Sequence, residues 1–164
     1  IVACKMPRKS VNAVEMLGAA TTDGVSVSGT LTGYEMALIN LALGHIQALE
    51  ISLPPSYVTV TPRYAATLSV DLSGGKAVLS ADLTLDVNKA PGQDIDLTAV
   101  EQLVEMDLKK AIKTMQRLRC DGLGFGNIAV RQFYTLDDWE RVKWRETYVA
   151  ADINISVRTA IMEK

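Results

Sequence analysis

The chain has 164 residues, with 17 Lys and Arg against 19 Asp and Glu, one His and two Cys. This length fits one domain, and 48% hydrophobic with 22% charged residues argues against disorder. A net charge of −2 with only 5% aromatic residues gives no basis for nucleic-acid binding, and no apolar stretch is long enough to span a membrane.

The N-terminal residues are expected to form a lead-in segment, 1–20, ahead of a single domain at 21–164. The first four residues, IVAC, resemble the processing box of a lipoprotein, in which Cys4 would carry the lipid; a chance tetrapeptide is the alternative. Because the sequence starts without Met, we expect a processed or excised piece of a longer protein. Cys4 and Cys120 lie too far apart in sequence to indicate a metal knuckle or a redox pair.

A short strand and a helix are predicted ahead of residue 50. Val25 and Val27 alternate with polar residues as far as Leu31, which is typical of a strand. Apolar residues then recur at spacings of three and four over 33–49, on nearly every face, so a helix buried on several sides is predicted. Glu35 lies in its first turn, where the helix dipole favours a carboxylate.

Two features of the first hundred residues raise the question of a metal or a general base. His45, the only histidine, lies in an apolar stretch, so partly buried packing is favoured over a catalytic or metal-binding role. Acidic residues flank the polar loop at 88–96, but their spacing does not fit a calcium loop, and solvation or helix capping is favoured. No metal site and no cofactor are predicted.

Three strands are predicted between residues 49 and 87. The first covers 49–53 and the second covers 57–72, where Pro62 lacks a backbone donor and predicts a bulge or an edge position. A Gly-Gly turn at 73–76 leads to the third strand at 79–87, in which apolar and polar residues alternate. This pattern predicts a hairpin with one buried and one solvated face.

A long helix is predicted from a capping box of Thr98 and Glu101 to about Arg119, with one apolar stripe along it. Basic residues crowd its C-terminal half. They are expected to complement the helix dipole on a solvated face rather than to form an anion-binding ridge.

The segment after this helix, 121–126, has the glycine-rich sequence DGLGFG. It is expected to end the helix with positive-φ caps, and because a phosphate loop should instead follow a strand and open a helix, nucleotide binding is not predicted. A further helix, capped at Thr135, carries Trp139 and Trp144 as packing residues. Alternation over 153–161 predicts a closing strand.

The predicted order is β-α-β-β-β-α-α-β, which is typical of the α+β class. We therefore expect an antiparallel-dominated sheet of about four to five strands whose apolar face packs against the long helix.

Several motifs recur in an order that points to a known family. The sequence CDGLGFG at 120–126 is followed by a basic-aromatic stretch at 131–134, and then by Trp139 and Trp144 before the closing strand. Upstream, a Gly-x-Leu motif precedes Glu35 by four residues. Over most of the chain this pattern resembles the C-terminal domain of the Ger(x)C family, the C subunits of bacterial spore germinant receptors.

The resemblance implies a lipoprotein on the outer face of the bacterial cell or the inner spore membrane. Such proteins act with a multi-spanning A subunit and a transporter-like B subunit in nutrient-triggered germination, and no enzymatic activity is assigned to them. The lipid anchor would then lie upstream of this domain, which disfavours Cys4 as the lipid site.

The predicted function is accordingly a non-catalytic protein-interaction domain, with Glu35, Asp121, Gly124 and Gly126 as candidate partner-binding residues. A dipole-stabilised carboxylate and a helix C-cap are the structural alternatives for these positions. The alternative function is a small-ligand-binding domain of an envelope lipoprotein, with a pocket between the sheet and the long helix. An enzyme is disfavoured because the sequence shows no pairing of a nucleophile with a base.

Overall fold

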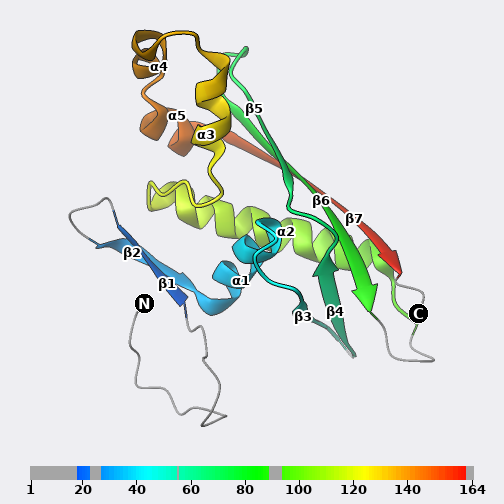
Figure 1. The fold of residues 1–164 in the computed structure, drawn as a ribbon. Coiled ribbons are helices and arrows are strands. Elements are labelled where there is room, and N and C mark those ends of the chain that lie inside the picture. The colour runs from blue at the N-terminus through cyan, green and yellow to red at the C-terminus, as the bar shows by residue number, and fades with distance from the viewer. Residues whose placement is uncertain (1–17, 23–26, 55, 89–93, 162–164) are drawn as a thin grey trace.

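The computed structural model describes residues 18–22, 27–54, 56–88 and 94–161. They form a five-stranded sheet, a separate two-stranded sheet and several helices, so the predicted α+β class is confirmed (Figure 1). Cys4, most of the lead-in segment and the middle of the predicted 88–96 loop lie outside the described residues.

The larger sheet is built around β6 (Val78–Asn88), which pairs with three other strands. β4 (Ser56–Pro62) and β5 (Thr67–Asp71) pair with it antiparallel, and β3 (Leu49–Leu53) pairs antiparallel with β4. β7 (Asp152–Ile161) pairs parallel with β6 along nearly its whole length. β4 and β5 therefore share one side of β6 and β7 occupies the other, in the antiparallel-dominated sheet that was predicted.

The core lies between β6 and the long helix α2 (Leu97–Arg117), which crosses one face of the sheet (Figure 1). Every second residue of β6 is buried on this face, as the alternation predicted: Leu79, Ala81, Leu83, Leu85 and Val87. Each large apolar side chain buried here contributes about 1.5–3 kcal/mol. The residues between them are more exposed on the polar face of the sheet.

The strand predicted over 57–72 is divided into β4 and β5. β4 ends at Pro62, which lies opposite Leu85, and the chain then turns before β5 begins. In this turn the N–H of Arg63 donates to the carbonyl of Thr84 at 3.0 Å, so the chain stays attached to β6. The pairing with β3 reaches only as far as Val60, so Pro62 pairs with β6 alone, and the missing donor of proline lies at an edge position and next to a break in the strand rather than at a bulge.

Helix α1 (Gly33–Ala42) is shorter than the predicted 33–49. The chain leaves the helix through Leu43 and then Gly44, whose φ of +69° is one that glycine adopts without strain. His45 follows this turn and is exposed. The prediction that it packs in a partly buried position was wrong, because the helix ends before reaching it.

A two-stranded sheet precedes α1. β2 (Val27–Thr32) was predicted in part, but its partner β1 (Gly18–Thr22) was not. β1 has the sequence GAATT, which carries no alternation of large apolar and polar side chains. The strand begins within the segment that was expected to be a lead-in.

The chain between α2 and β7 forms short helices: α3 (Phe125–Ala129), η1 (Val130–Gln132), α4 (Leu136–Val142) and α5 (Trp144–Ala150). We call this segment the α3–α5 lobe; it lies at one end of the sheet beside β5 (Figure 1). The single helix predicted around the two tryptophans is broken at Lys143, whose φ is +49°. The predicted cap at Thr135 is confirmed, since its side chain accepts from the N–H of Asp138.

The N-terminus of α2 differs from the prediction. Asp96 is the N-cap, and its carboxylate accepts from the backbone N–H groups of Thr98 and Ala99. Glu101 does not fold back onto the cap, so the predicted capping box of Thr98 and Glu101 is absent.

Two glutamates of α2 bind the outer edge of β7 instead. Glu105 accepts from the N–H of Val157 at 3.0 Å, and Glu101 accepts from the N–H of Thr159 at 2.7 Å. The two carboxylates lie four residues apart on one side of the helix, which matches the two-residue repeat of outward N–H groups on the strand. They occupy donors that an edge strand would otherwise leave unpaired.

Candidate functional site

The described part of the chain shows no metal centre, and the thiol of Cys120 is held in its protonated form. No group of three or more His, Cys, Asp or Glu residues there could hold a metal ion. Burial, followed by the charge of Asp121, raises the pKa of the Cys120 thiol, which favours the protonated form over a nucleophilic thiolate. Among these residues, no helix is both long and apolar enough to cross a bilayer.

Asp121 organises the glycine-rich segment that follows α2. Its Oδ1 atom accepts from the N–H groups of Gly124 and Phe125 at 3.0 Å each, and its Oδ2 atom accepts from the N–H of Gly126 at 2.6 Å. Oδ2 also accepts from the indole N–H of Trp144 at 3.2 Å. The carboxylate therefore ties the start of α3 to the start of α5, and these four donors use its acceptor sites.

Glycine is needed at positions 124 and 126 for two different structural reasons. Gly124 has a φ of +81°, in the left-handed region that favours glycine. At Gly126, an added Cβ atom would lie only 2.6 Å from Nε1 of Trp144. The close passage of the backbone beside the indole thus requires the absence of a side chain.

A row of aromatic rings runs through the lobe from Phe133 to Tyr148. The centroids of Phe133, Trp139, Trp144 and Tyr148 follow one another at 5.8, 5.8 and 6.0 Å. Trp139 and Trp144 are partly buried against the core, so their prediction as packing residues is confirmed. The hydroxyl of Tyr148 is buried and has no hydrogen-bond partner among the described residues, and its pKa is raised by burial and then by the charge of Asp121.

Glu35 joins α1 to α2. Its Oε2 atom accepts from the backbone N–H and the hydroxyl of Thr32 at 2.9 Å each, which completes a capping box at the start of α1. Its Oε1 atom accepts from the hydroxyl of Thr114 on α2, also at 2.9 Å. Burial raises the pKa of Glu35, but the hydrogen bonds from Thr32 and Thr114 and the charge of Lys110 outweigh it and lower the pKa.

The structure does not join the four predicted site residues into one site. Asp121, Gly124 and Gly126 belong to one hydrogen-bonded loop, whereas Glu35 lies at the junction of α1 and α2. Both groups are attached to the C-terminal half of α2, and no described hydrogen bond links Glu35 to the loop. Each carboxylate is occupied by internal donors.

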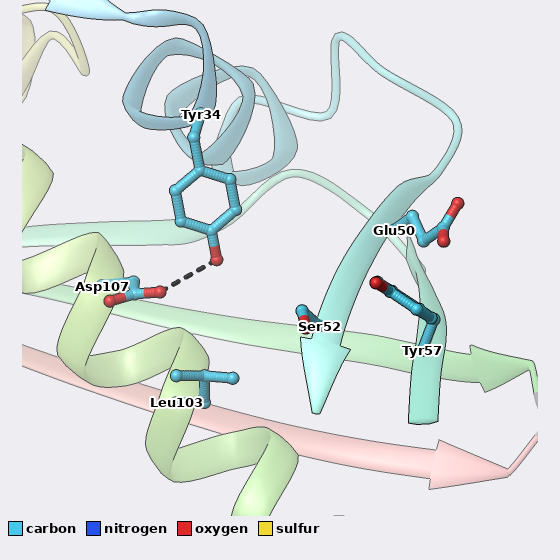
Figure 2. Close-up of a pocket in the computed structure, with 6 residues that line it drawn as sticks. All are labelled: Tyr34, Glu50, Ser52, Tyr57, Leu103 and Asp107. Atoms are coloured by element: carbon cyan, nitrogen blue, oxygen red, sulfur yellow. Dashed lines mark hydrogen bonds between the residues drawn. The ribbon is translucent and has the colours of Figure 1, made fainter. Parts of the chain in front are cut away.

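A concave surface whose lining residues the sequence did not reveal lies between α1, α2 and the β3–β4 hairpin. It has a volume of about 390 Å³ and is lined by Tyr34, Glu50, Ser52, Tyr57, Leu103 and Asp107. Figure 2 shows Tyr34 projecting from α1 toward Asp107 on α2, with Glu50, Ser52 and Tyr57 on the neighbouring strands. We call this surface the tyrosine pocket.

The tyrosine pocket is partly fixed by one hydrogen bond. The hydroxyl of Tyr34 donates to Oδ2 of Asp107 at 2.9 Å (Figure 2). Burial, together with this bond and the negative charge of Asp107, raises the pKa of Tyr34. The pocket thus combines two tyrosines with the carboxylates of Glu50 and Asp107, and these come from segments of the chain that no local motif connects.

Comparison with known proteins is consistent with this architecture. The model of the family described as "Spore germination B3/GerAC like, C-terminal" matches residues 18–164. A solved structure described as the crystal structure of the GerBC protein is similar in fold, with a TM-score of 0.71 and 17% sequence identity. The match covers 89% of this chain and 50% of that one, so the chain spans about half the length of GerBC. No curated protein matches the chain significantly.

Substitution of Gly126 tests the close passage beside Trp144. Gly126→Ala is expected to lower the free energy of unfolding by about 1–3 kcal/mol and to change the tryptophan fluorescence, because the new methyl group displaces the indole. Gly75→Ala is the matched control, since a Cβ atom there meets nothing within 4 Å. Urea unfolding followed by circular dichroism measures both variants, and equal midpoints would contradict the predicted clash.

The lowered pKa of Glu35 predicts a pH-dependent contribution to stability. The ionised carboxylate of Glu35 stabilises the folded state fully above the pKa of an unfolded glutamate, about 4.3. This stabilisation is lost as the pH falls through the lower pKa of the folded state. The melting temperature of Glu35→Gln should therefore lie below that of the native chain at pH 7 and approach it below about pH 4. A difference that stays constant from pH 7 to pH 3 would exclude a role for the ionised carboxylate, and Glu140→Gln on the exposed side of α4 is the control.

Proposed function

The chain belongs to the spore germination B3/GerAC-like C-terminal family, the C-terminal domain of the Ger(x)C germinant-receptor subunits, and we propose that it serves there as a non-catalytic protein-interaction domain. The partners in this proposal are the A-type and B-type membrane subunits of the receptor. An upstream lipid anchor would hold the full-length protein at the outer face of the bacterial cell or the inner spore membrane.

The observation that carries the proposal is the exposed apolar surface of the α3–α5 lobe. Val130, Tyr134 and Leu136 are exposed within one short segment, Tyr134 completely and Leu136 by 69%. Exposed apolar side chains that gather in one place are typical of protein-interaction surfaces. We call these three residues the lobe surface.

Three of the predicted partner-binding residues hold the helices of the lobe that carries this surface, and the fourth lies at the junction of α1 and α2. Asp121 and Gly126 hold the start of α3 against Trp144, and Gly124 supplies the left-handed turn that this geometry needs. Glu35 holds α1 against α2 through Thr114. Their proposed contribution to partner binding is therefore to position surfaces, because their own polar groups are engaged inside the domain.

Recovery of partner subunits from spore membranes tests the proposal. Full-length C subunit carrying Tyr134→Ser with Leu136→Ser should recover the A-type and B-type subunits at least five-fold less well than the native protein, at equal abundance in immunoblots. Tyr64→Ser is the control, because Tyr64 is similarly exposed but bonds Thr84 on the polar face of the sheet. Native recovery with the double variant would refute the lobe surface, and absence of the protein from the spore inner membrane would refute the germination role.

A small-ligand-binding role is a second candidate, and the tyrosine pocket favours it. Tyrosine faces and carboxylates together attract organic cations, so the ligand class is an ammonium or guanidinium compound. Arginine amide should raise the melting temperature of the chain in a saturable way, whereas acetamide at the same concentration should not. Glu50→Gln should weaken the effect at least three-fold, and an identical response in that variant would exclude the pocket as the site.

A further inference from the structure

Along the outer edge of β7, only part of the strand has its outward backbone N–H groups bonded to other described residues. The N–H of Asp152 donates to the carbonyl of Ala77 beside β6, so the even-numbered residues of β7 direct their N–H groups toward β6. The odd-numbered residues direct theirs outward, as the bonds from Val157 and Thr159 to the two glutamates of α2 show. The same alternation directs the backbone N–H groups of Ile153 and Ile155 outward, while the side chain of Ile153 is buried in the core.

The N–H groups of Ile153 and Ile155 have no hydrogen-bond partner among the described residues. Beside them, two hollows of about 390 and 340 Å³ run between α2 and β7. Lys109 lines both hollows, Lys113 lines the first and Met106 the second. We call this continuous surface the β7 groove: an open strand edge on one side and an exposed helix face with two lysines on the other.

Positive charge exceeds negative charge around the β7 groove. Asp152 lines the first hollow and forms an ion pair with Lys76, and Glu105 lines the second hollow and accepts from the N–H of Val157 while keeping its negative charge. Because the pair of Asp152 and Lys76 is neutral, Lys109, Lys113 and Glu105 leave the groove with a net charge of +1. An ammonium group is a hydrogen-bond donor, so neither Lys109 nor Lys113 can satisfy the outward N–H groups of the strand. Both can pair with carboxylates of a chain that lies along the strand.

We propose that the β7 groove binds an extended acidic segment of a protein partner, which adds to the sheet as a strand beside Ile153 and Ile155. The backbone of the segment would accept from the two outward N–H groups, and its carboxylates would meet Lys109 and Lys113. The two glutamates limit the added strand to the N-terminal half of β7, because they already occupy the donors of the other half. The proposal requires neither the lobe surface nor the tyrosine pocket.

A second copy of this chain fits the β7 groove less well. Antiparallel pairing of the two open half-edges about a two-fold axis would bring both copies of Lys109 and Lys113 to the same interface. Repulsion between like charges disfavours that arrangement. The charge of the groove thus selects an acidic partner over self-association.

Amide chemical shifts of the ¹⁵N-labelled 164-residue chain test the proposal. The probe is a capped heptapeptide of alternating Glu and Val, and the control is the same peptide with Lys in place of Glu. The acidic peptide should shift the amides of Ile153 and Ile155 and slow their hydrogen exchange at least ten-fold at saturation. The basic peptide should bind at least ten-fold more weakly.

Variants separate the backbone contribution from the charge. Ile155→Pro removes one outward N–H without a bond to β6 and should weaken the acidic peptide at least five-fold, whereas Ile155→Val should bind normally. The double variant Lys109→Glu with Lys113→Glu, both on the exposed face of α2, should bind the basic peptide more tightly than the acidic one. If the proline variant does not fold, this double variant still tests the proposal. Equal binding of the peptides, shifts elsewhere, or self-association through the same amides without peptide would each overturn the proposal.

Discussion

The packing of the apolar face of the five-stranded sheet against α2 is the interaction on which the other elements depend. α2 contributes one buried stripe to this interface and offers polar side chains along its flanks. Thr114 on one flank bonds Glu35 of α1, and the glutamates on another bond β7. Gln116, which is buried, donates to the carbonyls of Tyr148 and Ala151 and so fixes the end of the lobe. Hydrogen bonds to the same helix therefore fix the position of each of these neighbouring elements.

The carboxylates of this domain work mainly as acceptors for backbone N–H groups. Asp121 accepts from four donors, Glu35 from three, and Glu101 and Glu105 bind the strand edge. Asp121 accepts through both oxygens of its carboxylate, whereas Glu101 and Glu105 bind the strand edge through Oε1 alone. These side chains hold the elements of the domain together.

The sequence predicted the elements with strong periodicity and missed those set by contacts distant along the chain. Alternation in β6 and the stripe of α2 predicted the core. The glycine-rich segment does contain a positive-φ glycine, Gly124, but this residue is the N-cap of α3; the left-handed residue that follows α2 is Arg119, so the prediction that glycines end this helix was wrong. β1 carries no periodic signal, and Pro62 alone does not tell a bulge from a broken strand. Glu101 has the spacing of a capping-box residue, yet its partner is a strand nearly sixty residues away, which local spacing cannot encode. The tyrosine pocket and the β7 groove were missed for the same reason.

The α3–α5 lobe and the β7 groove meet at the junction between α5 and β7. The open half of the β7 edge begins immediately after Ala151, where the lobe ends. Gln116 spans this junction with two bonds of 2.7 and 3.0 Å, and because the amide is buried, breaking either bond would leave a polar group without a partner. Rotation of the lobe relative to α2 would break these bonds and therefore costs energy. A partner that displaces the lobe and a strand that docks beside Ile153 would act on the same junction, so each would alter the affinity for the other.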